Sequence, residues 1–368
     1  MKIFFAIKNL SSSVGGAERV LCEIASILVN RGHQITVITF DSKGSNSFYY
    51  LDSKIRRIDL SIGDSSSQTK LFESFFRLRA LKKVIVKEKP SVVVGFMHSI
   101  YILLAFALIG VSIPLIASEH IVIDHYRKKP FQLLLLIFSS ILINQFTVLS
   151  SSIKKRYPYL IQRKMKVIPN PIKNVKIKKF HQKNFSRKIL LNIGRLEHQK
   201  DHLTLIKAFS MIAGSFPQWD LRIVGDGSMR NKLKKEINLL NLNKRIFLKG
   251  FTKHIDSEYA QADIFVISSF YESFGLVTAE AMSCGLPCVG FASCPGTNEL
   301  IVHEKTGLLV DSIGGRSASL ASALTRIMSD EKFRKILGKT GEKEIKKKFS
   351  EKEVADSWEH LLYNVSKN

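Results

Sequence analysis

Cysteine and acidic residues are in short supply in this chain of 368 residues. The four cysteines lack the paired spacing of metal ligands and lie in no secretory context: Cys22, Cys284, Cys288 and Cys294. We therefore expect reduced thiols in the cytosol and no disulfide. Only 31 Asp and Glu accompany 56 Lys and Arg, which gives a formal net charge of +25. Such a surface attracts anionic partners, and nucleic acid, an anionic membrane face and phosphorylated substrates are all open possibilities.

An unbroken hydrophobic run long enough to cross a membrane is also missing. The first apolar run, residues 3–7, is followed by polar residues and indicates a buried strand, not a signal peptide. Residues 96–118 contain no Asp, Glu, Lys or Arg, and their length alone would admit a transmembrane span. Three helix-breaking residues interrupt them: Gly110, Ser112 and Pro114. We therefore expect a short helix followed by a strand instead.

Short apolar runs alternate with helical patterns along both halves of the chain. In the first half the expected elements are strands at 2–7, 34–39, 92–95 and 114–117 and helices at 16–30, 71–87 and 100–109. In the second half they are strands at 189–193, 221–224, 245–248, 264–267 and 287–291 and helices beginning near 201, 229, 276 and 317. This alternation predicts parallel sheets with right-handed crossovers. A chain of this length suits two domains of about 170 to 180 residues each.

Two carboxylates, Glu272 and Glu280, flank a turn between a strand-like run, residues 263–267, and a helix-forming segment, residues 276–284. Three backbone N–H groups would be the first unpaired donors of that helix: those of Phe274, Gly275 and Leu276. The positive end of the helix dipole lies behind them. The segment therefore predicts an anion site with a carboxylate on either side, suited to a ligand that is part phosphate and part polyhydroxyl.

Three further motifs precede this segment: Gly15-Gly16-Ala17-Glu18-Arg19, Ile168-Pro169-Asn170-Pro171 and Gly194-Arg195-Leu196. Through the order and spacing of these motifs, nearly the whole chain resembles the retaining, nucleotide-sugar-dependent glycosyltransferases of glycosyltransferase family 4. The resemblance implies an α/β protein of GT-B fold, with two Rossmann-like domains and a cleft between them. We predict an acceptor domain at residues 1–172, a linker at the lysine-rich residues 173–188, a nucleotide-sugar domain at 189–348 and a C-terminal helix at 349–368. The resemblance implies that this helix returns to the first domain.

Arg195 and Lys200 lie where a strand ends and a helix capped by Asp201 would begin. Arg can hold phosphate oxygens in bidentate fashion, and Lys adds a mobile point charge. Many transferases of the other major fold use a metal held by an Asp-x-Asp pair, which is absent from this sequence. We therefore predict that Arg195 and Lys200 act catalytically with the three amides as a diphosphate clamp that needs no metal or cofactor.

The resemblance assigns Glu280 to the ribose hydroxyls of the nucleotide and Glu272 to hydroxyls of the donor sugar. A carboxylate can accept hydrogen bonds from two neighbouring hydroxyls, so these roles are chemically reasonable. The alternative is a pair of solvated charges at a helix end. Gly16 is predicted to approach the donor diphosphate closely, although a plain turn is the alternative. His120 follows a strand on the side where ligands bind, and it is either catalytic or structural.

A basic amphipathic helix at residues 71–87 predicts attachment to an anionic bilayer, although its apolar face could equally lie on the sheet. It sets Phe72, Phe75, Phe76 and Leu78 beside Arg77, Arg79, Lys82 and Lys83. Linker lysines would add to the attraction: Lys173, Lys176, Lys178 and Lys179. We therefore expect a peripheral enzyme on the inner face of the cytoplasmic membrane.

The favoured function is transfer of a hexose or N-acetylhexosamine from a UDP-sugar to a lipid-linked glycan in bacterial surface polysaccharide synthesis. Two other functions are open alternatives. One is a nucleotide-sugar epimerase of the same fold. The other is a basic nucleic-acid-binding protein, but no recognised binding module appears and the basic residues are spread over helices and linker, so we expect no nucleic acid partner.

Overall fold

The structure is a computed structural model that describes residues 1–12, 15–63, 71–127, 129–172 and 187–367. Residue contacts divide the chain into two compact units. Unit 1 comprises Met1–Pro171 and Glu351–Asn368, and unit 2 comprises Ile172–Ser350. Most of the predicted linker, residues 173–186 with its four lysines, lies outside the described residues.

In unit 1, seven described strands form one sheet in the order β3-β2-β1-β4-β5-β6-β7. Every pairing of these strands is parallel. The strands are β1 Lys2–Ala6, β2 Gln34–Thr39, β3 Arg56–Asp59, β4 Val92–Phe96, β5 Leu115–Ser118, β6 Gln145–Val148 and β7 Met165–Val167. All five residues of β4 are buried, as expected for a central strand covered on both faces.

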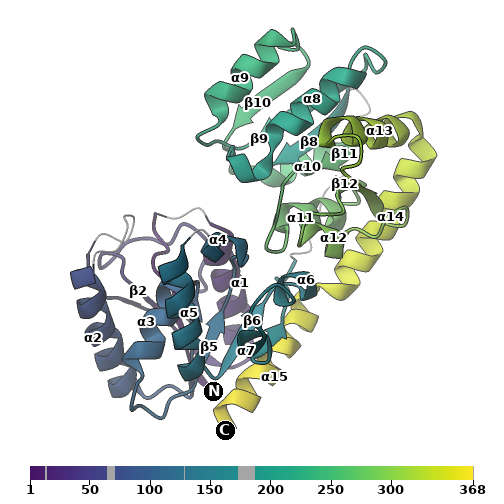
Figure 1. The fold of residues 1–368 in the computed structure, drawn as a ribbon. Coiled ribbons are helices and arrows are strands. Elements are labelled where there is room, and N and C mark those ends of the chain that lie inside the picture. Colours follow the sequence, from purple (N-terminus) through teal and green to yellow (C-terminus); the bar gives the residue numbers. More distant parts are fainter. Residues whose placement is uncertain (13–14, 64–70, 128, 173–186, 368) are drawn as a thin grey trace. The chain divides into compact units, whose positions relative to one another are not determined.

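Helices cover the sheet of unit 1. They are α1 Gly16–Asn30, α2 Leu71–Glu88, α3 His98–Ala107, α4 Asp124–Arg127, α5 Pro130–Leu142, α6 Ser151–Lys154, α7 Tyr159–Gln162 and α15 Glu351–Lys367. Helix α3 packs against both α2 and α5, so these three run side by side (Figure 1). The C-terminal helix α15 packs on α1, and its Trp358 stacks on Phe96 at 6.3 Å between ring centroids.

In unit 2, six described strands form a second sheet in the order β10-β9-β8-β11-β12-β13, again with parallel pairings only. The strands are β8 Lys188–Ile193, β9 Trp219–Val224, β10 Ile246–Gly250, β11 Ile264–Val266, β12 Cys288–Phe291 and β13 Gly307–Val310. The helices are η1 His198–Lys200, α8 His202–Ile212, α9 Arg230–Leu239, α10 Ile255–Gln261, α11 Leu276–Ser283, α12 Thr297–Leu300, α13 Arg316–Ser329 and α14 Glu331–Lys348. The core centres on Trp219 and Phe209, which are fully buried.

The strand order reverses next to the first strand of each sheet, between β1 and β4 in unit 1 and between β8 and β11 in unit 2. Crossovers on the two sides of such a point leave the sheet in opposite directions. Doubly wound proteins bind ligands at such a point, outside the carboxyl ends of the two strands. In unit 2 this point lies between the loops that follow β8 and β11.

All the strands predicted from apolar runs are present, with bounds shifted by at most two residues. The helix predicted at 100–109 begins two residues earlier, at His98. The transmembrane alternative for residues 96–118 is wrong, because none of the helices in the described part of the chain is long and apolar enough to span a bilayer. Several elements were not predicted: β3, β6, β7, β13, α5 and α14.

Candidate active site

The loop after β8 carries Arg195 on a backbone that neighbouring glycines hold in place. Leu196 N–H donates to Asp226 O at 2.9 Å, and Met229 N–H donates to Leu196 O at 2.8 Å. Gly225 has a φ of +141°, and a Cβ there would lie 2.0 Å from the carbonyl oxygen of Gly194. The Gly225-Asp226-Gly227 segment therefore has a packing role, because only glycine lets it approach the Arg195 loop so closely.

Arg195 itself is exposed. Its backbone accepts a hydrogen bond from Glu197 N–H at 2.8 Å, and the Glu197 carboxylate is held by Ser228 Oγ at 2.8 Å. None of the residues that the structure describes forms a salt bridge with the Arg195 guanidinium. The Glu197 carboxylate lies near enough for Arg195 to lower its pKa, although Ser228 contributes more to that shift. An exposed cation on an ordered loop can contact an anionic ligand directly.

Lys200 and Glu272 form an ion pair that joins the loops after β8 and β11. The Lys200 Nζ lies 2.7 Å from Oε1 and 2.9 Å from Oε2 of Glu272. Ser269 Oγ also donates to Glu272 Oε1, at 2.6 Å, and only 7% of Glu272 is exposed. The sequence predicted separate roles for the two charged residues, whereas the structure brings them into contact. An ammonium group has three donors, so Lys200 can hold Glu272 and still reach a phosphate oxygen.

The turn before α11 has the backbone that an anion site requires. Gly275 has a φ of +87°, in the left-handed region that favours glycine. None of the described residues accepts a hydrogen bond from the backbone N–H groups of Phe274, Gly275 and Leu276. Phe274 is buried against Phe349, with ring centroids 5.3 Å apart, and this contact anchors the turn. These amides can therefore donate to an anion at the helix N-terminus.

Glu280 lies in the second turn of α11 and is 5% exposed. Tyr259 OH donates to Glu280 Oε2 at 2.8 Å and lies 3.1 Å from Val277 O. Glu272 and Glu280 are thus both buried and hydrogen-bonded, so the alternative of solvated charges at a helix end is wrong. Buried carboxylates with fixed orientations are suited to binding hydroxyl groups.

The remaining predicted residues, Gly16 and His120, belong to unit 1. Gly16 begins α1 after the N-cap Gly15, and α1 is the helix that follows β1 along the chain. His120 follows β5, stacks on Phe96 with ring centroids 5.2 Å apart, and lies with Nε2 3.0 Å from Ser118 Oγ. Burial lowers the pKa of His120 to about 4. The imidazole is therefore neutral at pH 7, where it can orient a hydroxyl but cannot supply a proton as imidazolium.

Sequence reasoning missed several residues that support these side chains. The hydroxyls of Ser269 and Tyr259 hold the two carboxylates, and only the position of Ser269, three residues before Glu272, gave a local signal. The predicted cap at Asp201 is wrong, because its side chain makes no capping bond to α8. It instead accepts a hydrogen bond from Arg316 Nε at 3.0 Å.

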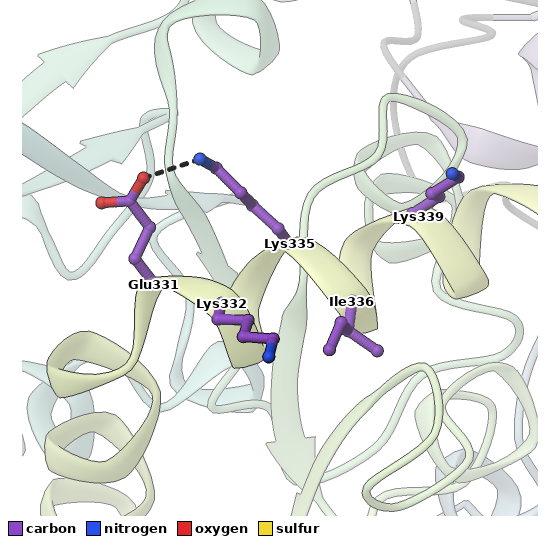
Figure 2. Close-up of a pocket in the computed structure, with 5 residues that line it drawn as sticks. All are labelled: Glu331, Lys332, Lys335, Ile336 and Lys339. Atoms are coloured by element: carbon purple, nitrogen blue, oxygen red, sulfur yellow. Dashed lines mark ion pairs between the residues drawn. The ribbon is translucent and has the colours of Figure 1, made fainter.

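A hollow on the outside of α14 contains none of the predicted site residues (Figure 2). Three lysines, Glu331 and Ile336 line it, and all five come from one helix: Glu331, Lys332, Lys335, Ile336 and Lys339. Lys335 pairs with Glu331 at 2.8 Å, which lowers the pKa of that carboxyl. These features are those of a solvated helix face. The candidate active site is therefore the group of residues around Arg195, Lys200, Glu272 and Glu280.

Two protein-family models match the chain and together cover residues 14–344. The first, "Glycosyltransferase Family 4", matches residues 14–174, and the second, "Glycosyl transferases group 1", matches residues 174–344. The chain belongs to the family 4 glycosyltransferases. It is accordingly a glycosyltransferase enzyme, as the sequence motifs predicted.

Two curated relatives align over most of their length. One is the Campylobacter jejuni "GalNAc-alpha-(1->4)-GalNAc-alpha-(1->3)-diNAcBac-PP-undecaprenol alpha-1,4-N-acetyl-D-galactosaminyltransferase", which is 27% identical over 99% of both chains. The other is the amylovoran biosynthesis glycosyltransferase AmsD of Erwinia amylovora, which is 26% identical over 91% of this chain and 92% of AmsD.

Solved structures of glycosyltransferases share the fold over nearly the whole chain. Sucrose-phosphate synthase from Thermosynechococcus elongatus has a TM-score of 0.82 at 21% identity, covering 98% of both chains. Anabaena Alr3699/HepE, solved in complex with UDP and glucose, has a TM-score of 0.80 at 20% identity, covering 99% of both chains. The predicted GT-B fold with two Rossmann-like domains is confirmed.

Proposed function

We propose that this glycosyltransferase moves a hexose or N-acetylhexosamine from a UDP-sugar to a lipid-linked glycan, with retention of anomeric configuration. The acceptor would be an intermediate of a bacterial surface polysaccharide. The observation that carries the proposal is the arrangement of Arg195, the Lys200–Glu272 pair, the amides of residues 274–276 and Glu280 around the switch point of one sheet. Cations and amides suit a diphosphate, and the carboxylates suit its sugars.

In the proposed reaction the bond between the anomeric carbon and the β-phosphate oxygen breaks, and negative charge develops on the departing UDP. Arg195, Lys200 and the three amides stabilise this charge. The acceptor hydroxyl forms the new bond on the same face of the sugar, and its proton passes to the departing phosphate oxygen. Glu280 holds the ribose, and Glu272 holds hydroxyls of the donor sugar. The roles of Gly16 and His120, which belong to unit 1, stay predictions.

The names of two similar proteins suggest which donor and acceptor to test first. The Campylobacter relative is named for transfer of N-acetylgalactosamine to an undecaprenyl-diphosphate glycan, and HepE was solved with UDP and glucose. We therefore infer UDP as the nucleotide and N-acetylgalactosamine or galactose as the first sugars to test. The acceptor class is a glycan on a polyprenyl diphosphate.

A lipid-linked acceptor requires an enzyme that works at a membrane, and unit 1 has a surface suited to one. Helix α5 leaves a stripe of four apolar side chains exposed, from 50% to 73%: Phe131, Leu134, Phe138 and Ile141. Helix α2 exposes Phe72, Phe75 and Phe76, beside the exposed Arg79, Lys82 and Lys83. Such exposed aromatic and aliphatic groups with basic neighbours are typical of helices that lie in a membrane interface.

One residue of the predicted basic face has a different role. Arg77 is 1% exposed, donates to Ile62 O at 3.1 Å and lies 4.6 Å above the Phe40 ring. It therefore ties α2 to the rest of unit 1, whereas the other three basic residues of the predicted face are exposed. We propose that α2 and α5 attach the enzyme peripherally to the inner face of the cytoplasmic membrane.

A donor screen tests the proposed function. The purified protein is incubated with UDP-N-acetylgalactosamine, UDP-galactose, UDP-N-acetylglucosamine and UDP-glucose, with and without a synthetic polyprenyl-diphosphate glycan. We expect UDP release that depends on the acceptor and a product one sugar longer with an α linkage. Conversion of the donor into its epimer without acceptor would instead show an epimerase. No turnover with any donor, together with tight salt-dependent binding of DNA, would favour a nucleic-acid-binding protein.

A further inference from the structure

Arg316, the first residue of α13, is distant in sequence from every predicted site residue, yet it contacts Asp201 and Ser268 next to the site. Its guanidinium sits 3.7 Å from the centroid of the Phe291 ring and 4.6 Å from that of Phe270. Its side chain is 20% exposed. A guanidinium held between two aromatic rings is fixed in its plane, so its hydrogen bonds have fixed directions.

These hydrogen bonds reach both loops of the candidate site. Arg316 Nε donates to Asp201 Oδ2 at 3.0 Å, and Nη2 donates to Ser268 O at 2.5 Å. Asp201 has a φ of +48°, in the left-handed region, where a residue other than glycine is strained by roughly 1 kcal/mol or more. The ion pair to Arg316 supplies a reason for that conformation, since Asp201 does not cap α8.

The two loops that Arg316 joins are those that hold the Lys200–Glu272 ion pair. Asp201 directly follows Lys200, and Ser268 Oγ donates to Lys200 O at 2.8 Å. The next residue, Ser269, donates from its hydroxyl to the Glu272 carboxylate. Phe270 N–H completes the connection by donating to Gln199 O at 3.0 Å. The position of the ion pair therefore depends on how these loops are held together.

We propose that Arg316 is a positioning residue for the transfer reaction, acting as a brace that sets the geometry of Lys200 and Glu272. The inference rests on the proposed function for its effect on catalysis. A displacement of about 1 Å in a catalytic group can cost roughly 100-fold in rate. Lysine cannot replace Arg316, because an ammonium group lacks the planar fork that contacts Asp201 and the Ser268 carbonyl together.

The first test compares Arg316→Gln and Arg316→Lys with a matched control on the same helix, Arg326→Gln. Arg326 also pairs with a carboxylate, Glu304, and lies 4.9 Å from the centroid of an aromatic ring, Phe333, but it touches neither loop. We expect kcat to fall roughly tenfold or more in both Arg316 variants, with less change in KM for the donor. The control should stay within about twofold of the parent enzyme.

A double-mutant cycle separates positioning from general structural damage. If Arg316 acts through the ion pair, Arg316→Gln should lower kcat by less than about threefold when Lys200→Ala is already present. The same fold-loss in both backgrounds would overturn the proposal. Asp201→Ala removes the acceptor of the Arg316 Nε hydrogen bond and should reproduce the Arg316→Gln effect.

Amide hydrogen exchange tests whether Arg316 holds the two loops together, and it does not require a measurement of enzyme activity. Arg316→Gln should speed exchange over residues 198–201 and 268–272, where the Phe270 N–H bond lies, while Arg326→Gln should not. Unchanged exchange in both segments would rule out the brace. If the parent enzyme transfers no sugar, the proposed function fails, whereas the exchange result still decides whether Arg316 holds these loops.

Discussion

The two units share a doubly wound parallel sheet, yet the carboxyl edges of their sheets differ in chemistry. In unit 2 that edge carries two partly buried ion pairs, Lys200–Glu272 and Arg316–Asp201. In unit 1 it carries His120, a neutral imidazole stacked on Phe96. The outer helices differ as well, because α2 and α5 of unit 1 expose large apolar side chains. One scaffold thus serves charge stabilisation in one unit and, in our proposal, lipid attachment in the other.

The largest expected effect comes from removing a cation of unit 2. Arg195→Ala and Lys200→Ala should each lower kcat by about 100- to 1,000-fold, or about 2.7 to 4 kcal/mol, because each donor acts on charge that develops in the transition state. Steady-state kinetics with the donor identified in the screen measures the effect. Lys207→Ala is the matched control, since Lys207 is an exposed lysine on the neighbouring α8. Unchanged kcat in both Arg195 and Lys200 variants would disprove the diphosphate clamp.

The second expected effect is on membrane binding, and it compares the exposed helix α5 of unit 1 with α14 of unit 2. The double variant Phe131→Ser, Phe138→Ser should weaken binding to phosphatidylglycerol vesicles by about 2 to 3 kcal/mol, because it removes two exposed aromatic groups from α5. Co-sedimentation with vesicles measures the loss.

Ile336→Ser provides the control for this variant. Ile336 is 54% exposed and lies among Lys332, Lys335 and Lys339 on α14 of unit 2 (Figure 2). An equal loss of vesicle binding in this variant would show that apolar groups near basic residues act wherever they lie, and α5 would lose its special role.

Strand positions and the carboxylate pair were predictable because their signals are local. Continuous apolar runs mark buried parallel strands, and the order of residues from Glu272 to Glu280 is contained in a single turn and helix. Contacts across the sheet were not predictable. Lys200 meets Glu272, 72 positions later, and Asp201 meets Arg316, 115 positions later. The first contact depends on β8 lying beside β11, and the second depends on α13 packing against α8. The sequence pattern specifies neither arrangement.

The missed helix α5 has another physical cause. Its mean hydropathy is high and its apolar residues are not confined to one face, so it lacks the periodic pattern of a helix with one side in water. The exposed stripe on α5 is the reason, since four of these apolar residues point away from the core. A helix that is apolar both toward the core and toward its exposed side thus lacks the alternation of apolar and polar residues by which a surface helix is recognised.

Acid should destabilise both units, because each contains histidines whose pKa is lowered by burial. Burial lowers the pKa of His202 in unit 2 and of His120 in unit 1 to about 4 in each case. The unfolded chain then binds more protons, so stability that is full above pH 6.5 is lost as the pH falls toward 4. For fully buried His202 the loss at pH 5.5 is about 1.4 kcal/mol.

Denaturant titrations at pH 7.5 and 5.5 measure this loss. His202→Leu should reduce the difference in unfolding free energy between the two pH values by about 1.4 kcal/mol. Exposed His360 gives the control variant, His360→Leu, which should leave the difference unchanged. If His202→Leu also leaves it unchanged, His202 is not the source of the acid sensitivity.

The smallest expected effect concerns the support of Glu280 in unit 2. Tyr259→Phe keeps the buried ring and removes the hydroxyl that donates to Glu280 Oε2 at 2.8 Å. One hydrogen bond to a charged group is lost, so we expect donor binding to weaken by about 1 kcal/mol while kcat changes little, because the ribose contact is the same in the ground and transition states. Calorimetry with UDP and steady-state kinetics measure the two quantities. A fall in kcat at unchanged UDP affinity would instead move Glu280 from nucleotide binding to the chemical step.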